Sequence, residues 1–223
     1  MISSFSKDNF HNICDQLAVK DRELGFIIQT YGYPPMWTRP NNFESLIHII
    51  LEQQVSLASA LAALNKLKEK LGKVTPAALL KLTDEELKAC YFSRQKTIYA
   101  RALAEALASK KLVLKQLESL ADDDVRTRLV SLKGIGNWTV DIYLMFVLQR
   151  TDHFPVGDLA AVNALKQVKK LPKDTDRYKI INVAAKWKPY RTVATMVLWH
   201  YYLSTRGKKT LTETGTKETD IIP

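Results

Sequence analysis

The chain has 223 residues, 46% of them hydrophobic and 25% charged, which is enough to bury a sizeable core in one large or two small globular domains. Its net charge of +10 favours a polyanionic partner, although such a charge can also serve solubility alone. Two distant cysteines, Cys14 and Cys90, and the lack of a long apolar run exclude a disulfide framework, a cysteine-bound iron–sulfur cluster and a membrane span, and predict an intracellular chain.

The first half of the chain predicts helices throughout. Apolar residues recur at helical spacing over 9–31 and again over 42–71, where Gly72 ends the pattern. Threonine residues that can cap a helix predict the starts of two further helices. These residues are Thr75 before Pro76 and Thr83 in a capping box with Glu86, and another helix is predicted from Ser93 to Ser109.

The second half continues the helical pattern. Asp122 or Asp123 can cap a helix that ends near Leu132, and a further helix follows the next turn as far as about Arg150. A Pro/Gly loop over 153–157 precedes the last predicted helices. These helices span about 159–170, 175–187 and 190–206. No alternation typical of a strand persists anywhere, so the sequence predicts an all-α fold.

Two glycines flank one apolar residue at the turn Gly134-Ile135-Gly136. Glycine permits left-handed backbone and close approach of another molecule, and Ile135 would anchor the turn in the core. The freed N–H groups of about Gly134, Gly136 and Trp138 would then face a phosphate oxygen at a helix N-terminus, with Lys133 beside them. An ordinary tight connection between two helices explains a bare Gly-x-Gly equally well.

An aspartate follows the Pro/Gly loop and precedes an apolar helix. Read alone, Asp158 is an ordinary helix N-cap. Its place about twenty residues after the glycine turn adds a second interpretation, in which the carboxylate has a chemical role.

Four segments in this order resemble the helix-hairpin-helix DNA glycosylase superfamily, and within it the 3-methyladenine DNA glycosylase II branch. The segments are Ile49–Ser56, Leu132–Thr139, Phe154–Asp158, and Trp187–Arg191 followed by Trp199. The resemblance covers roughly residues 41–206. It implies two helical subdomains that flank a DNA-binding cleft. One spans about 42–150 and holds the hairpin, the other combines about 1–41 with 151–206, and 207–223 is expected to be a disordered tail.

The resemblance also implies the chemistry. Asp158 matches the catalytic aspartate of the superfamily, which stabilises the cationic sugar as a base departs. Trp199, Trp138 and Leu57 match residues of the pocket for the extruded base. A cationic alkylated purine favours such electron-rich aromatic faces, although core packing explains any tryptophan equally well.

DNA contacts are implied for the hairpin and for the turn near residue 54. In the hairpin, the expected residues are Lys133, Gly134, Ile135, Gly136 and Thr139. Gln54 matches the residue that wedges into the gap left by the flipped base, with Gln53 as the alternative; an exposed helix glutamine is the simpler explanation. The resemblance suggests a monovalent cation on the carbonyls of Leu132 and Ile135, but no cofactor and no catalytic metal.

The sequence therefore predicts a monomeric, monofunctional glycosylase that releases alkylated purines of the 3-methyladenine and 7-methylguanine type from double-stranded DNA, without contact to a membrane. It would act in the cytoplasm or nucleoid of a bacterium, or in the nucleus of a eukaryote. Relatives that also cleave the strand carry a lysine two residues after the second glycine, where this chain has Trp138, so an oxidised-base glycosylase/lyase is disfavoured. A non-catalytic helix-hairpin-helix DNA-binding module remains the alternative, although pure binding would not need Asp158 and Trp199 together.

Overall fold

The computed structural model describes the backbone of residues 3–214 and the side chains of residues 3–206. These residues form helices joined by turns and loops and contain no β-strand; one isolated bridge pairs Ser4 with Arg150. The all-α prediction is confirmed. Contacts divide the chain into two compact units, a first made of residues 3–38 and 149 onward, and a second made of residues 39–148.

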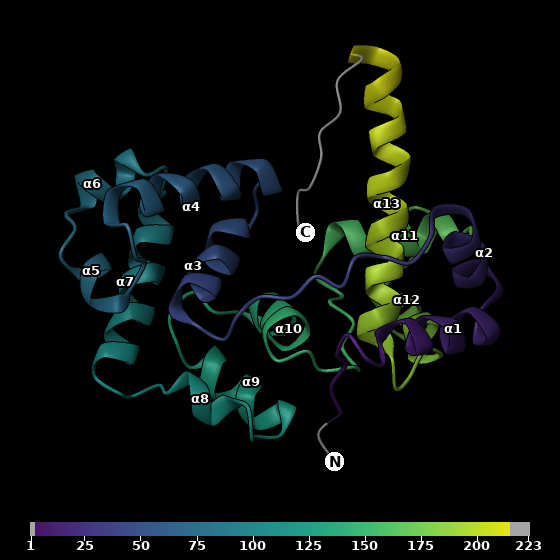
Figure 1. Ribbon diagram of the computed structural model, residues 1–223, viewed down its shortest axis with the longest axis horizontal. Helices are drawn as coiled ribbons and strands as arrows, with labels where there is room; N and C mark the ends of the chain where they lie inside the picture. The colour runs from purple at the N-terminus through teal and green to yellow at the C-terminus, as the bar shows by residue number, and fades with distance from the viewer. Residues whose placement is uncertain (1–2, 215–223) are drawn as a thin grey trace. The chain divides into compact units, whose positions relative to one another are not determined.

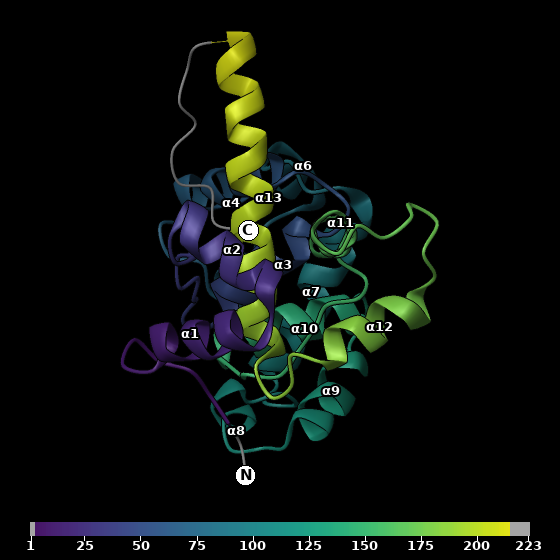
Figure 2. The same ribbon diagram turned by 90° about the vertical axis from the view of Figure 1, so that its right-hand side faces the viewer.

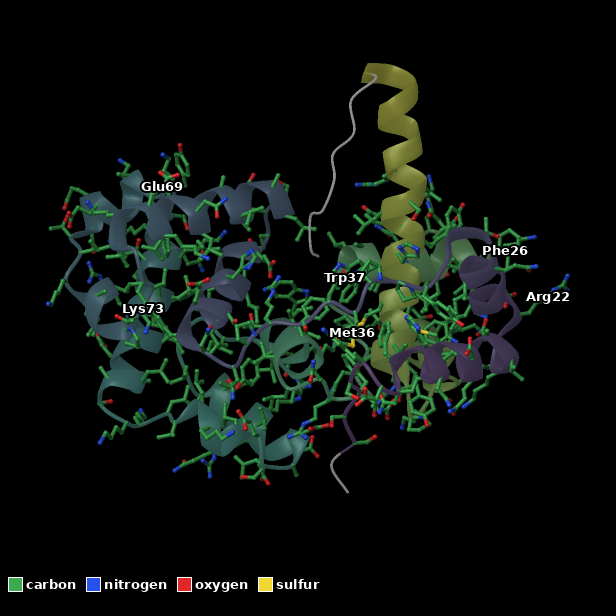
Figure 3. All side chains as sticks on the ribbon, in the orientation of Figure 1. Arg22, Phe26, Met36, Trp37, Glu69 and Lys73 are labelled. Atoms are coloured by element: carbon green, nitrogen blue, oxygen red, sulfur yellow. The ribbon has the colours of Figure 1, made fainter. Side chains whose placement is uncertain are left out.

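The first unit is built around its last helix. Its helices are α1 (Phe10–Lys20), α2 (Arg22–Tyr31), α11 (Leu159–Val168), α12 (Arg177–Ala185) and α13 (Arg191–Thr214). Helix α13 packs against α1, α2 and α11, and it extends beyond the other helices of this unit (Figures 1 and 2). Its first half is buried because Val193, Met196 and Val197 fill the core. The outer face of α2 points away from this core and carries Arg22 and the exposed Phe26 (Figure 3).

The single helix predicted over 9–31 is wrong, because the chain turns at Asp21. The Asp21 carboxylate accepts the N–H of Leu24 at 3.2 Å and caps α2. It also accepts Trp187 Nε1 at 2.6 Å and Lys169 Nζ at 2.6 Å, and these bonds lower the pKa of the carboxyl group against the opposing effect of its burial. The apolar spacing runs on in phase across this break, so periodicity alone does not reveal it.

The second unit holds the remaining helices. They are α3 (Phe43–Glu52), α4 (Leu57–Leu71), α5 (Pro76–Leu80), α6 (Asp84–Ala89), α7 (Arg94–Ala108), α8 (Leu114–Leu117), α9 (Asp122–Val130) and α10 (Asn137–Ile142), which continues as a π-helical turn η1 (Tyr143–Val147). Helix α3 is buried along most of its length and contacts α4, α7 and α10. It is therefore the central helix of this unit, and the segments at its C-terminal end are supported from several sides.

The capping predictions in this unit are mostly confirmed. Thr75 and Thr83 each accept a main-chain N–H as predicted, and Thr83 and Glu86 form the complete capping box. Ser93 also accepts a main-chain N–H, at the start of α7. The aspartate cap of α9 is wrong, because the helix begins at Asp122 and the acidic residues lie in its first turn instead. There they still favour the helix through its dipole.

Three further predictions need correction. The helix predicted over 42–71 is broken between α3 and α4, and the helix expected to reach Arg150 ends at Val147 in the π-helical turn. The last helix runs to Thr214, eight residues beyond its predicted end at 206, and the remainder of the predicted tail, 215–223, lies outside the described residues. Within the described residues, no helix combines the length and the apolar character needed to cross a bilayer.

Candidate active site and hairpin

Asp158 lies in the first unit at the N-terminus of α11. Its Oδ1 accepts the N–H of Ala161 at 2.7 Å, so it caps the helix as its position predicts. The same oxygen accepts Nε1 of Trp199, on α13, at 3.1 Å. Asp158 is half-buried and Trp199 is only 3% exposed. The structure thus brings together two of the predicted site residues, and two N–H donors fix the orientation of the carboxylate.

Helix α13 also fixes the other end of the loop that carries Asp158. At its first residue, Arg191 forms a bidentate pair with Asp152, with Nε–Oδ1 at 2.6 Å and Nη2–Oδ2 at 3.0 Å. Thr192 accepts the N–H of His153 at 3.0 Å. Because one helix holds the loop at both ends, the carboxylate of Asp158 sits on a rigid support.

The glycine turn in the second unit connects α9 to α10 and has the geometry that two glycines permit. Gly134 has a φ of 87°, and a Cβ there would lie 2.0 Å from the ring of Tyr99, so no other residue fits. Ile135 is 4% exposed and anchors the turn in the core, as predicted. Around Gly136, by contrast, no described atom beyond its two chain neighbours lies within 4 Å of an added Cβ. Packing within the chain does not require glycine there, which leaves the surface open to another molecule.

The N-terminus of α10 is exposed at this turn. No side chain among the described residues caps it, and Lys133, Gly136 and Asn137 are exposed. The first N–H groups of a helix have no partner within the helix, and they favour an anion. Arg126 on α9 donates to Asp141 at 2.5 Å and to the Asn137 side chain at 3.1 Å, which fixes α9 against α10.

The α3–α4 turn carries Gln53 and Gln54. Gln54 is exposed and has a φ of 58°, in the left-handed region that favours glycine. Ser56 then accepts the N–H of Ser59 and caps α4. The Gln53 side chain instead points to the hairpin, where its Nε2 donates to the carbonyl of Gly134 at 2.9 Å and to Oγ1 of Thr139 at 3.0 Å.

The other predicted pocket residues lie in the second unit. Trp138, in the first turn of α10, and Leu57, in the first turn of α4, are both half-buried. Asp158 and Trp199 belong to the first unit. The structure therefore groups the predicted residues into two sets, one around the carboxylate and one around the hairpin and the α3–α4 turn.

Sequence reasoning did not find two supporting contacts. Lys96 donates to the carbonyl of Leu51 at 2.5 Å near the end of α3. Burial lowers the pKa of its ammonium group from the ordinary value. The bonds of Gln53 to the hairpin are the second case. Both join residues at least 45 positions apart in the sequence, so no local pattern could have predicted them.

No group of three or more His, Cys, Asp and Glu side chains within the described part of the chain could hold a metal ion. Main-chain oxygens of the hairpin are a different kind of ligand. The carbonyl of Leu132 accepts the N–H of Ile135 at 3.2 Å and retains a second lone pair. By donor type it fits a hard cation.

Comparisons with known proteins agree on one family. A family model described as HhH-GPD superfamily base excision DNA repair protein matches residues 47–189. DNA-3-methyladenine glycosylase 1 of Schizosaccharomyces pombe is 32% identical over 203 residues, which cover 89% of this chain and 88% of that protein. Among solved structures, DNA-3-methyladenine glycosidase from Bacillus halodurans has a TM-score of 0.72 at 30% identity and covers 92% of this chain and 94% of its own. The S. pombe 3-methyladenine DNA glycosylase in complex with abasic DNA has a TM-score of 0.75 at 26% identity and covers 93% and 100%.

Proposed function

Because the chain belongs to the HhH-GPD superfamily of base excision DNA repair proteins, we propose that it is a monofunctional DNA glycosylase that hydrolyses the N-glycosidic bond of alkylated purines in duplex DNA. The relatives named as DNA-3-methyladenine glycosylases support this activity, and the solved complex of one of them with abasic DNA supports DNA as the partner. The observation that carries the assignment of residues is the Asp158 carboxylate, held by two N–H donors. We take the enzyme to act as a monomer.

Hydrolysis of the N-glycosidic bond of a cationic purine requires little from the protein beyond one negative charge. A purine methylated at N3 or N7 is cationic, so it leaves as a neutral base and needs no strong acid. The sugar becomes oxocarbenium-like as the bond breaks. An ionised carboxylate beside it stabilises that cation and can orient the attacking water. Glycoside hydrolases that cleave poorer leaving groups use two carboxylates for the same task.

The absence of an amine nucleophile supports the monofunctional assignment. Strand-cleaving relatives use a lysine two residues after the second hairpin glycine to form a Schiff base, and this chain has Trp138 there. Trp138 and Leu57 are proposed to line the pocket for the extruded base. An aromatic face is suited to a cationic purine.

The hairpin is proposed to grip one DNA strand through its main chain. The open surface at Gly136 and the uncapped N-terminus of α10 support a phosphate contact there, and Lys133 adds positive charge. We further propose that a monovalent cation binds the carbonyls of Leu132 and Ile135, where it would supply positive charge beside the strand.

Asp158→Asn tests the catalytic assignment. Asparagine is as good an N-cap as aspartate, and its Oδ1 can accept the same two bonds, so folding and DNA affinity should be unchanged. The single-turnover rate of 3-methyladenine release should fall by roughly a hundredfold or more. The assay should extend to duplexes that contain 7-methylguanine, hypoxanthine and ethenoadenine to define the preferred lesion.

A matched control exists in the same unit. Asp176 caps α12 by accepting the N–H of Lys179 at 2.9 Å, so Asp176→Asn makes the same chemical change at another helix start. It should leave base release unaffected. Near-normal release by Asp158→Asn would remove this carboxylate from the mechanism. A wild-type protein that binds DNA but releases none of these bases would instead be a non-catalytic helix-hairpin-helix binder.

A further inference from the structure

We propose that Gln53 is a positioning residue, which braces the α3–α4 turn against the hairpin so that both meet DNA as one rigid surface. The proposal rests on the proposed function for the reaction that it serves, but its geometry lies within the second unit. It assigns Gln53 a different role from that of a residue that enters the DNA.

Both protons of the Gln53 amide are used in the brace. One N–H points to the carbonyl of Gly134 at 2.9 Å and the other to Oγ1 of Thr139 at 3.0 Å, residues 81 and 86 positions away in the sequence. Gln53 is half-buried and Thr139 is 2% exposed. Shielding from water strengthens such bonds and makes their loss costly.

The bond to Gly134 also determines which way the hairpin main chain faces. A carbonyl held by an amide inside the unit cannot turn its partial negative charge toward an approaching phosphate. The ring of Tyr99 lies close under Gly134 and limits how far the turn can move. Gln53 therefore favours the orientation in which the turn presents N–H groups rather than a carbonyl oxygen to the strand.

On the other side of the brace, the α3–α4 turn is anchored at both ends, and the residues between the two anchors are exposed. Lys96 holds the carbonyl of Leu51, and Ser56 caps α4. Gln54 and Val55 between these anchors are exposed, and Gln54 is held in the left-handed conformation. A residue that fills a gap in a base stack needs such support, because errors of about 1 Å in a site can cost a hundredfold in rate.

The test compares Gln53→Glu and Gln53→Met. The first keeps the shape but replaces the donor with an acceptor facing a carbonyl; the second keeps the length and removes the donor without adding charge. Thr139→Val removes one of the two acceptors with little change in shape. Gln116 on α8 is exposed, and Gln116→Met serves as the matched control. All variants should be checked for cooperative unfolding before comparison.

Hydrogen exchange of the free protein is the first measurement. We expect both Gln53 variants to speed exchange in the segments 53–57 and 131–139 together, while Gln116→Met changes neither. The second measurement is affinity for a duplex with an abasic-site analogue. Gln53→Met should weaken it roughly tenfold, because the variant removes both hydrogen bonds of the brace. The double variant with Thr139→Val should be no worse than Gln53→Met alone, because the two residues share one interaction.

Unchanged exchange in segment 131–139 for both Gln53 variants overturns the brace, and so does full additivity with Thr139→Val. These outcomes are independent of base release. If the wild type releases no alkylated purine, the proposed function fails while the exchange result still decides the brace. If the wild type is active and the Gln53 variants match it in both measurements, the brace fails and the proposed function stands.

Discussion

At the scale of single residues, the contact between Asp158 and Trp199 gives the tryptophan a more specific role than a pocket wall. Its ring is 3% exposed, so it is part of the core of the first unit, and its polar edge reaches the carboxylate. Replacing it with alanine would remove both contributions at once, with a loss of about 3–5 kcal/mol of stability from the cavity alone. That variant cannot separate the two effects.

Trp199→Phe separates them. Phenylalanine keeps most of the packing but has no N–H for Asp158, so we expect a modest loss in melting temperature and a fall of roughly tenfold in single-turnover base release, because a carboxylate held by fewer donors is less well oriented. Trp187→Phe is the control, since Trp187 is equally buried and donates its Nε1 to Asp21 in the same unit. A rate loss of the same size in both variants would show that Trp199 acts through stability alone.

At the scale of elements, the sequence predicts the structural features that depend only on residues close together in the chain. Caps such as Thr75 and Thr83 need a partner three residues away, so the pattern contains both halves of the interaction. The Asp158 cap and the buried Ile135 follow from equally local signals. The family resemblance then adds a chemical role that the local pattern does not contain.

The sequence does not predict the breaks at Asp21 and Gln53, for the converse reason. Apolar residues continue at helical spacing through both, and the bonds that stabilise each break come from residues far away in the sequence. Trp187 and Lys169 bind Asp21, and the hairpin binds Gln53. Contacts between distant segments therefore determine where these helices break, and a single sequence does not show which distant segments meet.

The left-handed conformation of Gln54 leads to a prediction in which stability and function change in opposite directions. Residues other than glycine pay about 1 kcal/mol for this conformation, so Gln54→Gly should leave the melting temperature unchanged or slightly raised. The same change removes the proposed wedge. We therefore expect a large loss of the fluorescence change of a 2-aminopurine beside the lesion at saturating protein.

Lys110 provides the control, because it is exposed and has a φ of 59° in the same unit. Lys110→Gly relieves the same kind of backbone strain at a site away from the α3–α4 turn and should not affect the fluorescence signal. If Gln54→Gly flips the base as well as the wild type does, the side chain at 54 is not the wedge.

At the scale of the whole molecule, the charge is unevenly distributed. Residues 166–188 contain eight Lys and Arg residues against Asp174 and Asp176, and so carry more than half of the net charge of +10 in about a tenth of the chain. Lys169 is engaged with Asp21 and Glu23. The exposed members of this segment, which we call the α12 basic segment, are Lys170, Lys173, Arg177, Lys179, Lys186 and Lys188. Exposed cations gathered on one segment are suited to phosphate contacts that do not depend on sequence.

If the α12 basic segment binds the DNA backbone, replacing Lys173, Arg177 and Lys179 with glutamine should weaken binding to undamaged duplex. The slope of log affinity against log salt should decrease by up to about 0.9 for each phosphate that the variant no longer neutralises, while the rate of base release at saturating protein stays the same. The matched control replaces Lys66, Lys68 and Lys70 on α4, which form ion pairs with Glu69, Glu44 and Glu86. This control removes the same charge from sites that are already neutralised locally, so its slope should change little. Equal slopes in the two triple variants would mean that net charge alone attracts the DNA and that the α12 basic segment binds no phosphate of its own.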